Sequence, residues 1–355
     1  MTEKPIEYQN REVIPQGEEF FRKFINPTKQ AAVDQVLPIQ VDFELNNKCT
    51  GSCLYCCSAS DTTGEISMPT EKVLSLIDEF ATFGIKQVIW PGGDSLLHPD
   101  CFTIWRYAGE KGLRNFVVTS GLISKKAARE IVANQSIKVA GIHIDTLDQQ
   151  IYNQVHGDPQ GLPQKIQGYW NLLEAGFSPQ KIFPCITLTK PALESIEETL
   201  DWYIDEMGAI FVDLIHFRPV RFGNKYPHWE PNISALKRAF EYRAKKLGEN
   251  WLRIGPMECS KFFCKTTFNI VCDGRVFPCG QIPDLVVGNV FEQSIQEIFT
   301  QKRDLILFDC EIKGECDDCE HNDVCFGCRA SGHHYKGDVW ESDPKCWLNP
   351  AAKDV

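Results

Sequence analysis

The chain has 355 residues, enough for one large α/β unit with a smaller attachment, and its 37 Lys and Arg against 48 Asp and Glu give a net charge of −11. This acidic balance, without a long run of Lys or Arg, argues against nucleic acid as a partner, because binding to phosphates needs a basic surface. The first residues are polar and no stretch approaches the roughly 20 apolar residues of a membrane span, so we expect a cytoplasmic protein without a membrane partner.

Short apolar runs alternate with helical patterns between residue 38 and about residue 220, which is typical of parallel β/α units. In the first helical stretch, Val73, Leu76, Ile77 and Phe80 are spaced i, i+3, i+4 and i+7, so they share one face. The fold class predicted is α/β, a partial (β/α)6 barrel of the TIM type with its active face at the carboxyl ends of the strands. The six candidate strands are 39–45, 86–90, 115–120, 139–144, 183–188 and 210–217.

Unusual motifs follow four of these strands. "CTGSCLYCC" (49–57) follows the first strand, "PGGD" (91–94) the second, "TSG" (119–121) ends the third and "DTLD" (145–148) follows the fourth. Because parallel strands end at the same edge, these motifs should meet and form a site. On the sixth strand, side chains alternate, so Asp213 and His216 should face opposite sides of the sheet.

The first motif suggests a metal site. In a reducing compartment, 16 cysteines indicate metal ligands rather than disulfides. Cys49, Cys53 and Cys56 are spaced C-x3-C-x2-C, and three thiolates can hold three irons of a cubane and leave the fourth iron open for a cofactor. A zinc loop that recruits a further ligand is the alternative. Cys57 lies outside the spacing, and we expect it to be a packed thiol.

This spacing, with the aromatic Tyr55 before the last cysteine, resembles the radical S-adenosylmethionine (SAM) superfamily. "PGGD" is similar to the family's Gly-Gly-Glu segment, "TSG" to its Thr-Asn-Gly turn and "HIDTLD" to its Ser-Leu-Asp-Thr-Leu-Asp run. For His143 and His156, packing is the alternative to contact with SAM. The residues that the resemblance implies for SAM binding are Tyr55, Gly92, Gly93, Asp94, Ser120, His143, Asp145 and His156.

A second group of cysteines follows residue 258. Cys264, Gly274 and Cys279 read C-x9-G-x4-C, and "CDDCEHNDVCFGC" (316–328) precedes Cys346. This resembles the SPASM domain, which binds two auxiliary clusters; two zinc knuckles are the alternative. The resemblance implies that Cys259, Cys264, Cys279 and Cys328 hold the first auxiliary cluster, and that Cys316, Cys319, Cys325 and Cys346 hold the second.

The expected domains are therefore an N-terminal extension (1–38), a radical SAM partial barrel (39–225), a bridging helical segment (226–258) and a small cysteine-rich SPASM domain (259–355). The cofactors implied are three [4Fe-4S] clusters and SAM, with flavodoxin or ferredoxin as electron donor. In this family, an electron from the cluster splits SAM, and the 5′-deoxyadenosyl radical abstracts hydrogen from the substrate.

The resemblance implies an oxidoreductase that oxidises or crosslinks a ribosomally made peptide, with a separate leader-peptide-binding protein as a possible partner. The alternative substrate is a small molecule, namely a sugar, an aminoglycoside or a tetrapyrrole side chain. A zinc-bound scaffold without turnover is a third reading. Cys185, on the fifth strand, is a candidate hydrogen donor if it faces the pocket, and a packed thiol otherwise.

Overall fold

A computed structural model describes residues 13–256 and 260–352 of the chain. Its centre is a curved sheet in which six parallel strands lie side by side in the order in which they occur in the sequence. All six predicted strands are confirmed, with ends that move by a few residues. They are β1 (Gln40–Phe43), β2 (Gln87–Trp90), β3 (Arg114–Thr119), β4 (Ile137–His143), β5 (Ile182–Leu188) and β6 (Asp213–His216).

The sheet continues into the cysteine-rich part of the chain. β7 (Thr267–Ile270) pairs in parallel with β1, with Gln40 opposite Thr267, and β8 (Arg275–Phe277) and β9 (Gly288–Asn289) follow as antiparallel strands. One nine-stranded sheet therefore crosses the domain boundary expected at residue 259, with the order β6-β5-β4-β3-β2-β1-β7-β8-β9. These strands of two to four residues are too short to carry a periodic signal, so they were not predicted.

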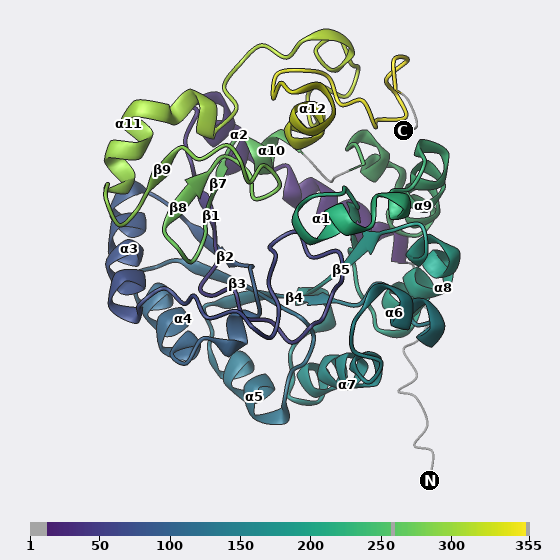
Figure 1. The fold of residues 1–355 in the computed structure, drawn as a ribbon, viewed down its shortest axis with the longest axis horizontal. Helices are drawn as coiled ribbons and strands as arrows, with labels where there is room; N and C mark the ends of the chain where they lie inside the picture. Colours follow the sequence, from purple (N-terminus) through teal and green to yellow (C-terminus); the bar gives the residue numbers. More distant parts are fainter. Residues whose placement is uncertain (1–12, 257–259, 353–355) are drawn as a thin grey trace.

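Helices cover the outside of the curved sheet, as Figure 1 shows for α3 to α8. The predicted stripe on α3 (Thr70–Phe83) is confirmed, because its buried residues are Val73, Leu76, Ile77 and Phe80. Phe80 meets Phe43 of β1 edge to face, with ring centroids 5.9 Å apart. The other helices between the strands are α4 (Cys101–Glu110), α5 (Lys125–Ala133), α6 (Gln149–Val155), α7 (Gly161–Glu174) and α8 (Ile196–Asp201).

Side chains of each strand alternate between this helical layer and the other side of the sheet, which we call the inner face. On β5, Ile182, Pro184, Ile186 and Leu188 are buried, whereas Phe183, Cys185 and Thr187 are half-buried on the inner face. Asp213 lies on the inner face of β6 and His216 is buried on the opposite side, so the predicted alternation is confirmed.

Aromatic side chains close the inner face at the amino ends of the strands. The rings of Phe183 and Phe211 lie 4.7 Å apart, and Phe211 lies 4.4 Å from Trp251. Phe20, on α1 (Val13–Phe24), stacks on Trp251 at 5.9 Å. Each such ring stabilises the fold by about 1.5–3 kcal/mol through burial. The N-terminal helix α1 therefore covers the barrel at the amino ends of the strands. The carboxyl ends, where the motifs lie, are at the opposite end.

The rest of the chain packs on the barrel edge next to β1 and β6. A small second core there is built from Ile282, Phe308 and Phe326, and it includes the side chains of Cys316 and Cys328. In Figure 1, α11 and α12 lie beyond β7–β9, at the top of the view. The remaining helices are α2 (Pro27–Asp34), α9 (Ile233–Leu247), α10 (Lys261–Cys264), α11 (Ile295–Ile306) and α12 (Arg329–Lys336).

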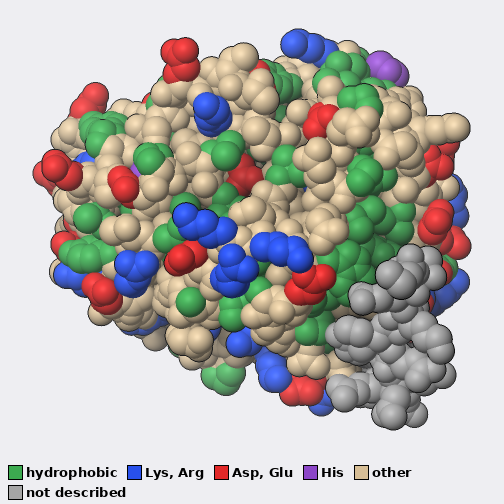
Figure 2. All heavy atoms as spheres, turned by 90° about the horizontal axis from the view of Figure 1, so that it is seen from below, with side chains coloured by type: hydrophobic (Ala, Val, Ile, Leu, Met, Phe, Trp, Pro, Cys, Tyr) green, Lys and Arg blue, Asp and Glu red, His purple; other side chains and the backbone are tan. Residues whose placement is uncertain are grey.

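The surface mixes charges of both signs. On the face drawn in Figure 2, Lys and Arg side chains lie beside Asp and Glu side chains, and hydrophobic side chains gather toward one side. Among the helices of the described residues, none combines the length and the apolar character that crossing a bilayer requires.

Candidate functional site

The loop that carries Cys49, Cys53 and Cys56 leaves β1 at its carboxyl end and is tied down by backbone hydrogen bonds. The Cys49 amide donates to the Asp61 carbonyl (2.8 Å). Two further bonds join the loop to the end of α6 and the residues after it: the Leu54 amide donates to the Val155 carbonyl (3.0 Å), and the Gly157 amide donates to the Ser52 carbonyl (2.8 Å). The first motif thus meets the segment that follows the fourth.

Asp145 is the centre of the contacts between these two motifs. Its carboxylate is fully buried and accepts from His143 Nε2 (2.8 Å) and from His156 Nε2 (2.9 Å). The Thr187 amide (2.7 Å) and the Tyr55 hydroxyl also donate to it. Four donors satisfy this carboxylate, so its main effect is to fix the groups around it.

His156 connects this carboxylate to the cysteine loop. Its Nδ1 lies 3.1 Å from the Gly51 carbonyl, so both ring nitrogens contact acceptors, and the ring stacks on Tyr152 at 4.2 Å. His156 is 1 % exposed. This arrangement holds the backbone between Cys49 and Cys53 in place. SAM contact by His143, Asp145 and His156 stays a prediction, but each already has partners within the protein.

Positive charge surrounds one of the thiols. His143 Nδ1 lies 3.7 Å from Cys53 Sγ, and Lys165 Nζ donates to the His143 carbonyl (3.1 Å). Burial opposes ionisation of Cys53, but the charges of His156 and Lys165 outweigh it and hold the pKa of that thiol well below the usual value. Burial, and then the charge of Cys53, raises the pKa of Cys49 to about 12. The site therefore favours a thiolate at Cys53.

The second and third motifs also meet. Asp94 Oδ2 accepts from the Ser120 hydroxyl (2.6 Å) and from its amide (3.1 Å), and both residues are buried. Gly93 lies against the start of the cysteine loop, where a Cβ would come within 2.2 Å of the Lys48 carbonyl oxygen. Only glycine permits this approach. The four motifs therefore form one continuous rim, although contact of these residues with SAM stays a prediction.

Backbone amides point at sulfur atoms of several predicted ligands. Donor-to-sulfur distances are 3.3–3.4 Å in all five cases: Gly51 to Cys49, Gln281 to Cys279, Gly327 to Cys325, Ser331 to Cys328 and Asp343 to Cys316. Such amides stabilise thiolates and are the surroundings that metal-bound sulfur requires. The Cys101 and Cys185 sulfurs, which are not predicted ligands, donate to carbonyl oxygens, and so does Cys53 Sγ, to the Gly51 carbonyl (3.7 Å).

Four cysteines of the C-terminal region line one cavity, namely Cys316, Cys319, Cys325 and Cys346. They come from three segments of the chain, and they are the set that the resemblance assigns to the second auxiliary cluster. Burial, and then the charge of Asp343, raises the pKa of Cys346. The donor chemistry of this cavity fits an iron–sulfur cluster, because soft thiolates are its ligands.

Three cysteines of the other auxiliary set also lie together. Burial, and then the charges of Cys328 and Cys264, raises the pKa of Cys279 to about 12, which reflects their proximity. Cys264 ends α10 and Cys328 is the N-cap of α12. Cys259, the fourth predicted ligand, lies outside the described residues.

Among the described His, Cys, Asp and Glu side chains, no group of three or more has the geometry that holds one metal ion. A cubane places each thiolate on a different iron, so its ligands stand farther apart than those of a single ion.

Three chemically reactive side chains lie in a row across the inner face. The register places His143 of β4 beside Cys185 of β5, and Cys185 beside Asp213 of β6. Burial raises the pKa of Asp213 to about 6, although the charge of Arg243 opposes the shift. Burial, and then the charge of Asp213, raises the pKa of Cys185 well above the usual value. Cys185 is therefore a neutral thiol that faces the site side of the sheet.

Lys165 is a site residue that was not predicted from the sequence. It is fully buried on α7, in the stripe that also contains Leu162 and Tyr169. A lysine at a core position of a helix is uncommon, and this break in the apolar pattern is the signal that could have identified it.

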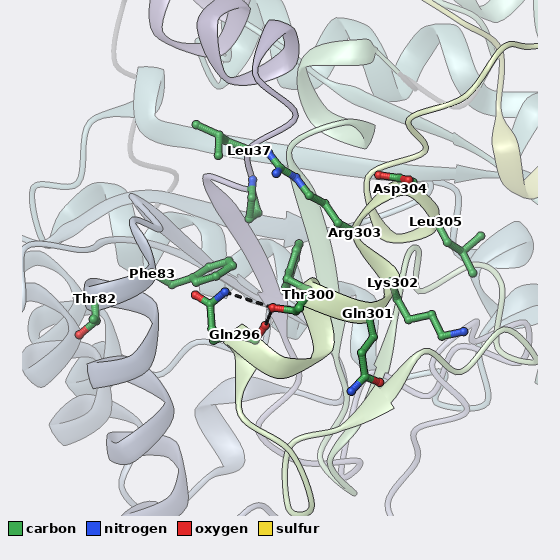
Figure 3. A pocket seen from close by; sticks show the side chains of 12 residues that line it. Leu37, Thr82, Phe83, Gln296, Thr300, Gln301, Lys302, Arg303, Asp304 and Leu305 are labelled. Carbon is green, nitrogen blue, oxygen red and sulfur yellow. Dashed lines mark hydrogen bonds between the residues drawn. The ribbon is translucent and has the colours of Figure 1, made fainter.

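A cavity of the described structure lies away from the rim. A pocket of about 720 Å³ opens between the end of α3, the segment before β1 and α11, with Phe83, Thr300 and Arg303 among its lining residues (Figure 3). None of the predicted site residues lines it, so we assign the chemistry to the rim of the barrel rather than to this pocket.

Comparison with known families agrees with the arrangement of the motifs. Residues 43–203 match the family model described as "Radical SAM superfamily". Residues 259–329 match SPASM, described as an iron-sulfur cluster-binding domain. The two matches cover the barrel from the end of β1 through α8, and most of the cysteine-rich region.

Individual proteins are similar over nearly the whole chain. The AdoMet-dependent heme synthase of Methanosarcina barkeri is 29% identical over 353 residues, which is 89% of this chain and 98% of that protein. The PqqA peptide cyclase of Methylorubrum extorquens is 22% identical over 351 residues, 91% of this chain and 89% of its own. Among solved structures, Streptococcus suis SuiB bound to S-adenosylmethionine superposes with a TM-score of 0.68 at 16% identity, covering 93% of this chain and 81% of SuiB, so the fold is shared.

Proposed function

The chain belongs to the radical SAM superfamily with a C-terminal SPASM domain, and from this premise we propose an enzyme that cleaves SAM reductively and abstracts hydrogen from a substrate at the inner face. The observation that carries the proposal is the convergence of the cysteine loop, Asp94 with Ser120, and Asp145 at one rim. When bound, a [4Fe-4S] cluster with an open iron supplies the electron that breaks a carbon–sulfur bond of SAM.

We assign Cys49, Cys53 and Cys56 as ligands of that cluster. His156 and Asp145 hold the loop in place from the side of β4, and His143 and Lys165 supply positive charge next to Cys53. In the C-terminal region, the first auxiliary cluster would be held by Cys259, Cys264, Cys279 and Cys328, and the second by Cys316, Cys319, Cys325 and Cys346. A reduced flavodoxin or ferredoxin is the proposed electron donor.

The inner face offers groups that could complete an oxidation. After loss of a hydrogen atom, the substrate reaches a net two-electron oxidation by giving up one more electron and one proton. Asp213, with its pKa raised to about 6 by burial, is the proposed proton acceptor, and an auxiliary cluster is the proposed electron acceptor. Cys185 beside it is instead placed to return a hydrogen atom, which would lead to epimerisation.

A carboxylate-bearing small molecule is the substrate class that we favour. Arg221 follows β6 with its backbone in the left-handed region (φ 48°), and its guanidinium forms no hydrogen bond or ion pair within residues 13–256 and 260–352. Its charge acts on Glu44 at the end of β1, so it lies close to the rim. A guanidinium there could bind a substrate carboxylate. The heme synthase relative makes a tetrapyrrole with acidic side chains the specific candidate.

A ribosomally made peptide is the second candidate, supported by the similarity to a peptide cyclase. The peptide, which the sequence alone favours, comes second here because the heme synthase shares more of its residues with this chain than the peptide cyclase does. A peptide substrate would bring in a separate leader-peptide-binding protein.

The test is an anaerobic assay of the iron-loaded enzyme with SAM, a flavodoxin-type reductant, and either an iron porphyrin with carboxylate side chains or peptides from neighbouring genes. We expect 5′-deoxyadenosine to form, and one substrate to change mass. Failure to form 5′-deoxyadenosine with a full complement of iron would contradict the proposed chemistry. A mass change in the peptide alone would select the second substrate class.

A further inference from the structure

Arg218 connects the end of the barrel to the cysteine-rich region. It follows β6 and is 3 % exposed. Its Nη1 donates to Cys328 Sγ (3.1 Å) and to the Ser331 hydroxyl (2.8 Å). A buried guanidinium thus touches the sulfur of a predicted ligand, and it comes from a different part of the fold than the other contacts of that sulfur.

The surroundings of this contact hold further charges. The Ser331 amide also donates to Cys328 Sγ (3.4 Å), and the Cys328 amide donates to Asp343 Oδ2 (3.1 Å). Lys345, directly before Cys346, pairs through Nζ with Glu230 (2.8 Å). Arg218 is therefore the cation in direct contact with the sulfur, while the neighbouring Asp343 contacts the Cys328 backbone.

We infer that Arg218 is a positioning residue that raises the reduction potential of the first auxiliary cluster through its hydrogen bond to Cys328. One-electron reduction of a cluster adds one negative charge to the iron and sulfur atoms. A buried cation hydrogen-bonded to a ligand sulfur stabilises that added charge more than it stabilises the oxidised state. The inference rests on the proposed function, since it requires a cluster at Cys328.

The contact also has a consequence for electron flow. Arg218 comes two residues after the end of β6, the strand whose inner face carries Asp213, so one short segment joins the proposed proton acceptor to the residue that contacts Cys328. A higher potential makes the first auxiliary cluster a better acceptor for an electron from the substrate. In the second set of cysteines, backbone amides donate to sulfur, from Asp343 to Cys316 and from Gly327 to Cys325.

The experiment is a redox titration followed by electron paramagnetic resonance, with a dithionite-type reductant. It uses the full chain with Cys49, Cys53 and Cys56 changed to Ala, so that signals from the SAM-binding cluster do not overlap. We expect Arg218→Gln to shift one of the two auxiliary signals to a more negative potential and to leave the other signal in place. Arg218→Lys should shift the potential of the same signal in the same direction but by a smaller amount. The lysine keeps the positive charge and loses the planar guanidinium that donates to Cys328.

Arg275→Gln is the matched control, because Arg275 is in the same region but pairs with Asp273 at the surface. Its potentials should equal those of the parent. The inference is overturned if Arg218→Gln, with its full iron content, titrates like the parent. Should Arg218→Gln lose iron, an unchanged potential in Arg218→Lys overturns it instead. Loss of both auxiliary signals in the parent itself would contradict the proposed function rather than the role of Arg218.

Discussion

The two cysteine regions of this protein are built in opposite ways. In the barrel, Cys49, Cys53 and Cys56 lie within one short loop, which is held by a buried network around Asp145. In the C-terminal region, the predicted ligands are spread from residue 259 to residue 346, and Cys316 and Cys328 are themselves part of a small core. Protein contacts hold the site of the barrel in place, whereas we expect the C-terminal region, whose small core includes predicted ligands, to depend more on bound clusters.

The largest effect is expected from breaking the compact site. Cys53→Ala should abolish 5′-deoxyadenosine formation, because an iron without its thiolate leaves the cluster incomplete. Iron content should fall by about four atoms per chain. Liquid chromatography with mass spectrometry measures the product. Cys57→Ala, one residue beyond the motif, is the matched control and should retain activity. Wild-type turnover by the Cys53 variant would refute the assignment.

Removal of iron should affect the C-terminal region more than the barrel. In protein prepared without iron, we expect amide hydrogen exchange to rise strongly across residues 310–350, because little regular structure holds that segment. Exchange in α3 and α4 should change little, since their buried stripes pack on the sheet without metal. Equal loss of protection in both regions would remove the contrast that we draw.

The network around Asp145 can be weakened without touching a thiol. His156→Ala takes one donor from the Gly51 carbonyl and one of the two donors from Asp145 Oδ2, where the Tyr55 hydroxyl stays, so we expect a loss of about 2–3 kcal/mol in the free energy of unfolding. Iron at the SAM site should also fall. His98→Ala is the control, because His98 is also buried but its Nε2 is hydrogen-bonded to the Met68 carbonyl. It should destabilise the fold without lowering the iron content of the SAM site. Denaturant unfolding measures the free energy of unfolding, and iron analysis measures the iron content of each variant.

The smallest expected effect is the pH dependence of stability that Asp213, on the inner face, should cause. Because the pKa of Asp213 is raised to about 6 in the folded state, its charged form destabilises the fold, and stability is lost as pH rises from about 4 through 6. Asp213→Asn should therefore stabilise the protein by about 1–2 kcal/mol at pH 8 and have almost no effect at pH 4.

The control for this pH dependence is Asp201→Asn, since Asp201 pairs with Lys246 (2.7 Å) at the surface and should give no gain at pH 8. A gain for Asp213→Asn that is the same at pH 4 and pH 8 would contradict burial as the cause.

Much of the barrel was predictable because its signals are local. Six apolar runs and the stripe of Val73, Leu76, Ile77 and Phe80 specify strands and a helix from neighbouring residues alone. The motifs after the strands predict a shared rim, because parallel strands end at one edge. The contact between Asp94 and Ser120 is a direct instance.

What the sequence by itself determined is the order of the strands, the position of the cysteine loop and the two sets of thiols, since these depend on spacing along the chain. Only the tertiary structure decided that β7 extends the sheet beside β1, that Lys165 and His156 support the loop, and that Arg218 reaches Cys328. These contacts join residues far apart in sequence, and their strength comes from burial and charge that exist only once the chain has folded.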